Sequence, residues 1–117
     1  MEEMLGMTTK KETIEELENA RKELLTEENQ KDLKGWTRVV QFHFKDIDEY
    51  WHFEVNDGVP GPLVNEEADD ADIRIKMDED VFLGIMAGEI NRMKAFTSGK
   101  VKVKAALKDI SKLTKFM

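Results

Sequence analysis

The sequence predicts an α+β fold, a two-layer sandwich in which helices cover one face of a mostly antiparallel sheet. Two observations support this prediction. Every clear strand segment alternates apolar and polar residues, which is typical of a sheet with one buried and one solvated face. Segments with helical spacing of apolar residues flank and interrupt these strands. The resulting element order is α-α-β-β-β-β-α-α-β-α, which gives five strands.

The composition is that of one globular domain. The chain has 117 residues, of which 40% are hydrophobic and 37% are charged, so it can bury a core of ordinary size. No internal repeat or linker divides it. We expect residues 1–8 to form a flexible N-terminus and residues 9–117 to form a single domain.

Two helices are predicted at the start of the chain. Thr9 and Glu12 match a capping box, in which the hydroxyl and the carboxylate satisfy helix amides reciprocally. Apolar residues at helical spacing follow over roughly 10–25. Thr26 then has the character of an N-cap before two glutamates, which predicts a second, short helix that ends at Gly35.

The next segments predict a hairpin and a further turn. Residues 36–45 and 50–57 alternate clearly, and a short polar stretch separates them. Asn56-Asp57-Gly58 predicts a tight turn, because Asp-Gly supplies the positive φ that such a connection needs. A brief third strand is expected to begin at Leu63-Val64.

The last third of the chain completes the fold. An alternating strand over 71–77 leads into an apolar helix that Asp78 is expected to cap and Gly88 to end. Asn91 is expected to cap a short helix. A second alternating strand over 100–107 and a final amphipathic helix follow.

Charge and composition limit the partners. The formal net charge of −7 argues against nonspecific binding of nucleic acids or anionic membranes, since a phosphate-binding protein needs a cationic footprint. A local basic patch is compatible with this charge, and we expect at most transient membrane contact. The chain has no cysteine, which removes disulfides and cysteine-based zinc sites. Its apolar runs are far shorter than the ~20 residues of a membrane span, and its start is unlike a secretory signal. We expect a cytoplasmic protein.

The two histidines allow two interpretations. If the hairpin pairs Phe42 with Phe53, then His43 and His52 lie opposite each other, with Glu54 beside them. Two imidazoles and a carboxylate could bind zinc. The favoured interpretation is that they are exposed residues of the wetted sheet face, which offers no water-excluded pocket.

Basic residues form a second pattern on the predicted open face. Lys100, Lys102 and Lys104 recur at period two and are expected beside Arg74 and Lys76. The favoured interpretation is a solvated face. The sharper alternative is a docking strip for a phosphate head group or an acidic partner.

The sequence contains no recognisable catalytic motif. It has no phosphate-cradling glycine loop and no G-x-S-x-G elbow, and its acidic clusters lack calcium-loop spacing. We therefore expect a protein that is not an enzyme and needs no cofactor or metal. The apolar helices and strands of the last third instead suggest an enclosure, although alternation alone does not distinguish a packed core from a hollow one.

The last third also resembles the sterol-carrier-protein type 2 family. The resemblance lies in the run 85–91, in Ala95-Phe96 and in the run 99–103, and it extends to Trp51–Gly58 and Ala71-Asp72. Together these segments span about residues 36–113. The order and spacing of the segments carry the resemblance.

The resemblance implies a five-stranded sheet with an apolar tunnel between sheet and helices. It also implies a protein that binds fatty acids, acyl-CoA, sterols or similar apolar molecules without transforming them. The positions that match the tunnel lining, with the last helix near its mouth, are Phe82, Met86, Ile90, Phe96, Val101, Val103, Ile110, Leu113 and Phe116.

This chain departs from the family pattern twice. Arg92 stands where the family commonly has proline, and Ala105-Ala106 replaces a usual glycine. The leading hypothesis is a non-enzymatic lipid carrier. The alternative is a module with a filled core that docks on another protein through its sheet face or C-terminal helix. The third hypothesis is a hydrolase or metal enzyme, for which stoichiometric zinc lost in a His43→Ala variant would be the evidence.

Overall fold

The computed structural model describes residues 8–113. Apart from Thr8, the N-terminus that we expected to be flexible lies outside the described residues, and so does Phe116. The elements follow the predicted order. They are α1 (Lys11–Glu23), α2 (Glu27–Leu33), β1 (Arg38–Phe44), β2 (Glu49–Asn56), β3 (Val59–Pro60), β4 (Ile73–Met77), α3 (Glu79–Met86), α4 (Arg92–Thr97), β5 (Lys102–Lys104) and α5 (Leu107–Leu113).

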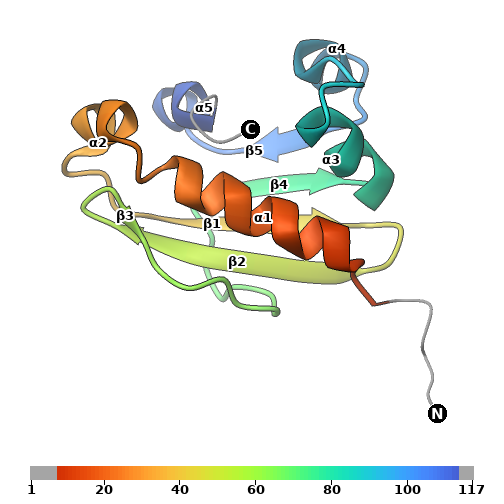
Figure 1. Cartoon of the computed structure of the whole chain (residues 1–117), viewed down its shortest axis with the longest axis horizontal. Coiled ribbons are helices and arrows are strands. Elements are labelled where there is room, and N and C mark those ends of the chain that lie inside the picture. The colour runs from red at the N-terminus through yellow and green to blue at the C-terminus, as the bar shows by residue number, and fades with distance from the viewer. Residues whose placement is uncertain (1–7, 114–117) are drawn as a thin grey trace.

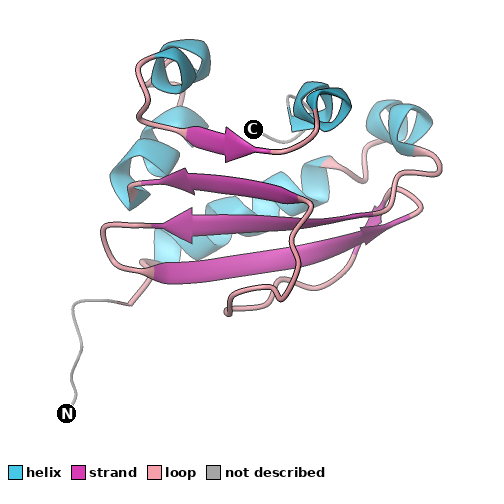
Figure 2. Ribbon diagram, turned by 180° about the vertical axis from the view of Figure 1, so that it is seen from behind, coloured by secondary structure: helices cyan, strands magenta, loops and turns pink. Residues whose placement is uncertain are grey.

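The five strands form one sheet in the order β3-β2-β1-β4-β5. Three of the strand pairs are antiparallel, and β1 and β4 are parallel. The helices lie on one face of the sheet, and within residues 8–113 no helix covers the other face (Figures 1 and 2). The predicted α+β sandwich is confirmed, and β3 and β5 are its edge strands.

The core lies between the sheet and helices α1 and α3. Alternation directs one face of each central strand inward, where Phe82 of α3 packs with ring centroids 5.7 Å from Phe42 and 5.5 Å from Phe44. The largest fully buried side chains are Leu17, Leu24, Leu33, Val40, Phe42, Phe44, Phe53, Val55, Ile73, Ile75, Met77 and Phe82.

The hairpin register differs from the predicted one. Phe42 pairs with Trp51 rather than with Phe53, so His43 faces Tyr50 and the two histidines are not opposite each other. The positive φ of Asp48 closes a short loop that places Glu49 opposite Phe44. The difference is two residues, which leaves every side chain on its predicted face.

The N-terminus of α1 is capped by a distant residue. The capping-box prediction is wrong, because the N-cap is Lys10 and it makes no side-chain cap bond. The Thr9 hydroxyl instead accepts a hydrogen bond from Trp51 Nε1 at 2.9 Å. The Lys10 amide donates to Oε2 of Glu79, 2.7 Å away. The buried carboxylate of Glu79 provides the acceptor that the local motif was expected to supply.

Three other predicted helix ends are confirmed. Thr26 accepts from the third amide of α2, and Asn91 does the same for α4. Gly88 follows α3 with a φ of 77°, a conformation that glycine adopts without strain.

Asp78 precedes α3 as predicted but does not cap it with its side chain. Its carboxylate accepts from Lys45 Nζ at 2.8 Å. Oδ1 of Asp46 accepts the amide of Glu79 at 3.0 Å instead. Both bonds join the start of α3 to the loop after β1. That loop is distant in the sequence, so a local capping motif does not predict these bonds.

The third strand begins earlier than predicted. Asp57 and Gly58 both have positive φ, so the chain reverses in two residues and Val59 pairs at once with Asn56. Val64, where the strand was expected, forms only an isolated bridge. The proline of β3 is tolerated because β3 is an edge strand.

Candidate functional site

An apolar pocket lies at the β5 edge of the molecule, between α4, β5 and α5. Its volume is about 150 Å³, it is partly open to solvent, and its walls are almost entirely apolar. The lining residues are Arg92, Met93, Phe96, Val101, Val103, Ile110 and Leu113. Arg92 is the only residue of this lining with a charged side chain, and it borders the pocket mainly with apolar atoms.

Local sequence motifs position the residues of α4 and β5 that line the pocket. The cap at Asn91 starts α4, which places Arg92 and Phe96 one turn apart on the same face. The chain reverses at Gly99, and the amide of Val101 donates to the Ala95 carbonyl at 3.0 Å. Alternation in the following strand then directs Val101 and Val103 toward the helices.

A buried carboxylate holds the third wall in place. Asp109 of α5 is 3% exposed, and its two oxygens accept from Trp36 Nε1 at 2.9 Å and from Arg38 Nε at 2.8 Å. Burial alone would raise the pKa of Asp109, but the hydrogen bonds from Arg38 and Trp36 outweigh it and hold that pKa below its ordinary value. We call these three residues the α5 latch.

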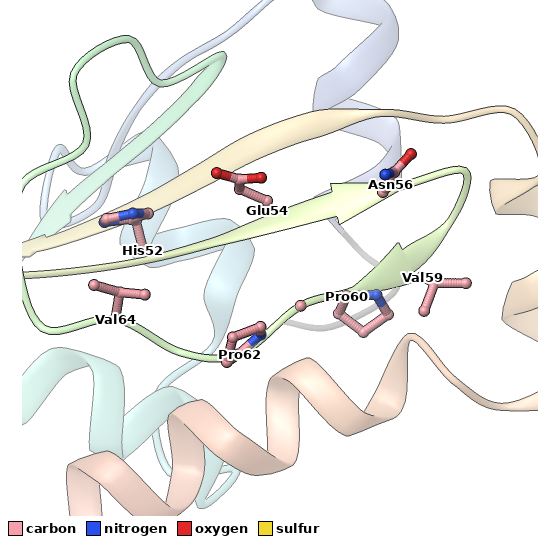
Figure 3. Close-up of a pocket in the computed structure, with 8 residues that line it drawn as sticks. His52, Glu54, Asn56, Val59, Pro60, Pro62 and Val64 are labelled. Carbon is pink, nitrogen blue, oxygen red and sulfur yellow. The ribbon is translucent and has the colours of Figure 1, made fainter.

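A larger depression lies elsewhere, along β2 and β3 (Figure 3). Its volume is about 570 Å³, but it is open and its lining mixes polar and apolar residues. Figure 3 shows His52 and Glu54 on one face of β2, with Pro60 and Pro62 on the neighbouring segment. Nδ1 of His52 lies 2.7 Å from the Glu66 carbonyl.

The geometry separates the residues of the zinc interpretation. His43 stacks on Tyr50 with ring centroids 4.0 Å apart, and its Nε2 lies 3.0 Å from Asp48 Oδ1. His52 is turned toward the Glu66 carbonyl instead. Across residues 8–113, no group of three or more His, Asp or Glu side chains is arranged to hold a metal ion.

Comparison with known proteins identifies the family. A model of the SCP-2 sterol transfer family matches residues 15–117. The chain belongs to the SCP-2 sterol transfer family. In general terms it is therefore a lipid-binding or lipid-transfer domain, a type that is generally non-catalytic and that also occurs within enzymes.

Solved structures share the SCP-2 fold. Sterol carrier protein 2 like 2 from Aedes aegypti aligns at a TM-score of 0.69 and 14% identity, covering 91% of this chain and 97% of that one. The palmitated form of that protein aligns at a TM-score of 0.65 and 17% identity, covering 90% and 91%.

An enzyme contains the same SCP-2 fold as one part. The sec-alkylsulfatase Pisa1 from Pseudomonas aligns at a TM-score of 0.60 and 17% identity, over 75% of this chain. This chain spans 14% of the length of that enzyme. No functionally curated protein matches the chain.

The pocket brings together part of the lining predicted from the SCP-2 resemblance. Five of the nine predicted residues line it, namely Phe96, Val101, Val103, Ile110 and Leu113. Phe82 is fully buried in the core, and Met86 and Ile90 pack partly buried against that core. Phe116 lies outside the described residues.

Beneath α3, side chains of the two layers pack against one another. Ile90 lies so close to Gly84 that a Cβ added there would overlap it, and Phe82 occupies the space above Phe42. A tunnel through the SCP-2 domain stays a prediction, whereas the pocket at the β5 edge is observed.

Sequence reasoning did not assign Arg92 to the lining. It recognised this residue only as a departure from the family pattern. The available signal was the Asn91 cap, which fixes where α4 begins and therefore which of its residues share a face with Phe96. Among the described helices of this SCP-2 family member, none is long and apolar enough to span a bilayer.

Proposed function

We propose that the chain is a non-enzymatic carrier that holds the hydrocarbon tail of a fatty acid, or of a similar acyl lipid, in the α4–β5–α5 pocket. The observation that carries this proposal is an apolar pocket whose single charged lining residue is Arg92. An apolar wall provides a favourable environment for methylene groups, and a guanidinium favours an acidic head group.

The size of the pocket sets what it holds. A protein cavity of about 150 Å³ lined by aliphatic residues accepts a benzene-sized guest, so the pocket accommodates about five or six carbons. At about 0.8 kcal/mol per buried methylene, this segment contributes roughly 4 kcal/mol. A longer tail extends through the open side or displaces α5, whose position depends on the α5 latch.

Lipid uptake is the direct test. Native mass spectrometry of the purified protein should show a copurified lipid or a stoichiometric adduct after palmitate is added. A mass that remains that of the bare chain after challenge with fatty acids, a phospholipid and a sterol would contradict the proposal.

A variant that fills the pocket should weaken uptake. Ile110→Trp places an indole where two or more methylenes would lie, and palmitate affinity is expected to fall roughly tenfold. Fluorescent fatty-acid displacement measures the change. Leu25→Trp is the matched control, since Leu25 is 48% exposed and lies away from the pocket. Equal affinities for the two variants would place the binding site elsewhere.

Arg92 should determine the preference for an acidic head group. Arg92→Gln is expected to reduce the preference for palmitate over hexadecanol by roughly tenfold, the value of one charged hydrogen bond. Lys94→Gln removes a cation from the same helix at a position outside the lining and serves as the control. Competition titrations with the two ligands give the ratio, and an unchanged ratio in Arg92→Gln would assign the head group to another residue.

A further inference from the structure

The charges of this acidic chain are strongly separated along the sequence. The segment from Arg92 to Lys112 contains seven of the 18 basic residues and only one of the 25 acidic residues. That acidic residue is Asp109, whose carboxylate is buried and bonded to Trp36 and Arg38. The net charge of −7 is therefore the sum of a basic segment, Arg92 to Lys112, and a strongly acidic rest of the chain.

The fold collects this basic segment on one edge of the molecule. α4, β5 and α5 lie together along the β5 edge, as both views show (Figures 1 and 2). We call this surface the basic edge. Its exposed lysines, none of which has an ion pair within residues 8–113, are Lys94, Lys100, Lys102, Lys104 and Lys108.

Like charges also face each other across the strands at this edge. Lys102 is the register partner of Lys76, and Lys104 is the register partner of Arg74. Directly opposed like charges destabilise a strand pair. None of these four cations forms an ion pair within residues 8–113, although Glu67 borders the same depression. An external anion would therefore relieve the repulsion.

Exposed apolar residues lie on the same edge. Among residues 8–113, five large apolar side chains are exposed, and three of them, Met93, Phe96 and Leu107, belong to this segment with exposures of 64%, 43% and 86%. Met93 and Phe96 also line the apolar pocket. Lysines interspersed with exposed apolar tips are the combination that binds the interface of an anionic bilayer.

We propose that the basic edge docks reversibly on anionic lipid bilayers and presents the pocket to the membrane surface. The role of this docking depends on the proposed carrier function. The docking itself requires no bound ligand. Lysine attracts anionic head groups as a charge that is not shape-specific. Leu107 and Met93 are also exposed, and a bilayer interface offers apolar groups for them to contact. A purely acidic protein surface would offer none.

Vesicle cosedimentation tests the docking. The full chain is expected to bind phosphatidylcholine vesicles with about 30 mol% phosphatidylserine, to leave pure phosphatidylcholine unbound, and to dissociate as salt rises to about 0.5 M. The variant Lys100→Glu/Lys102→Glu/Lys104→Glu should lower the partition coefficient roughly 100-fold. It should fold, because two of the new glutamates face Lys76 and Arg74.

Matched controls separate the site from the total charge. Lys11→Glu/Lys22→Glu/Lys31→Glu changes the net charge equally at exposed positions of α1 and α2 and should retain most of the binding. Leu107→Ser should weaken binding, whereas Leu25→Ser should not. Failure of the unmodified chain to bind, or equal losses in both triple variants, would overturn the proposal.

A second probe and a second readout complete the design. Binding of soluble polyglutamate without binding of anionic vesicles would assign the edge to an acidic protein and overturn the membrane proposal. Palmitate uptake in vesicle-free solution is measured in parallel. Loss of vesicle binding with intact uptake in the Lys100→Glu/Lys102→Glu/Lys104→Glu variant supports docking as a separate property. Absence of uptake with intact vesicle binding would instead contradict only the carrier function.

Discussion

Asp109→Ala is expected to lower the free energy of unfolding by about 3 kcal/mol, because it leaves a buried indole N–H and a partly buried guanidinium without their acceptor. Both partners lie more than 70 residues away in the sequence, at 73 for Trp36 and 71 for Arg38. The variant therefore removes the two hydrogen bonds that tie α5 to Trp36 and to Arg38 of β1. Urea unfolding measures the change.

The α5 latch also predicts a pH dependence. The pKa of Asp109 lies below its ordinary value of 3.8 in the folded state. Its contribution to stability is therefore complete above that ordinary value and is lost as the pH falls through the lowered pKa. The stability difference between the parent chain and Asp109→Asn should stay constant from pH 7 to about pH 5 and shrink as the pH falls below about 4.

The control for the latch is an exposed aspartate. Asp70→Ala makes the same charge change at an exposed loop position and should alter stability by less than about 0.5 kcal/mol. If α5 is the movable wall of the pocket, Asp109→Asn should also release bound lipid faster in stopped-flow transfer. Equal stabilities for Asp109→Ala and Asp70→Ala would show that the latch does not hold α5.

Glu79→Ala should produce a second large loss, also of about 3 kcal/mol, because two donors lose a buried acceptor. Oε2 of Glu79 accepts the Lys10 amide and the Thr13 hydroxyl, each at 2.7 Å, and Glu79 is 3% exposed. The substitution uncaps α1 and removes the buried hydrogen bonds that join it to α3. Thermal unfolding and helical circular dichroism measure the effect.

The neighbouring residue provides the control for Glu79. Asp80 pairs with Lys10 Nζ at 3.0 Å, but its side chain is 83% exposed. Solvent screens such a pair, so Asp80→Ala should lose far less stability than Glu79→Ala. Comparable losses for the two variants would mean that the Glu79 bonds do not anchor α1.

The faces of the strands were predictable from sequence, but their register was not. Alternation requires Phe42 and Phe53 to face the core, since a slip by one residue would expose them. A slip by two residues keeps both inside, so periodicity does not distinguish the observed pairing of Phe42 with Trp51 from the predicted one. The loop that ends at Asp48 determines which of the two registers forms.

The candidate site was predictable in part. Phe96, Val101 and Val103 were assigned to an apolar lining through the family resemblance. The structure places all three in the pocket lining. Met86 was assigned by the same reasoning but packs against the core. Helical periodicity shows that a residue faces inward without showing whether the space that it faces is filled.

The sequence by itself determined the element order, the inward face of each strand and the family. These depend on residues close together in the chain, where spacing and turn chemistry act directly. The tertiary structure alone decided which carboxylates cap α1 and hold α5, and that the pocket and the basic residues share the β5 edge. Those contacts join segments up to 73 residues apart, and no local pattern encodes the distances between them.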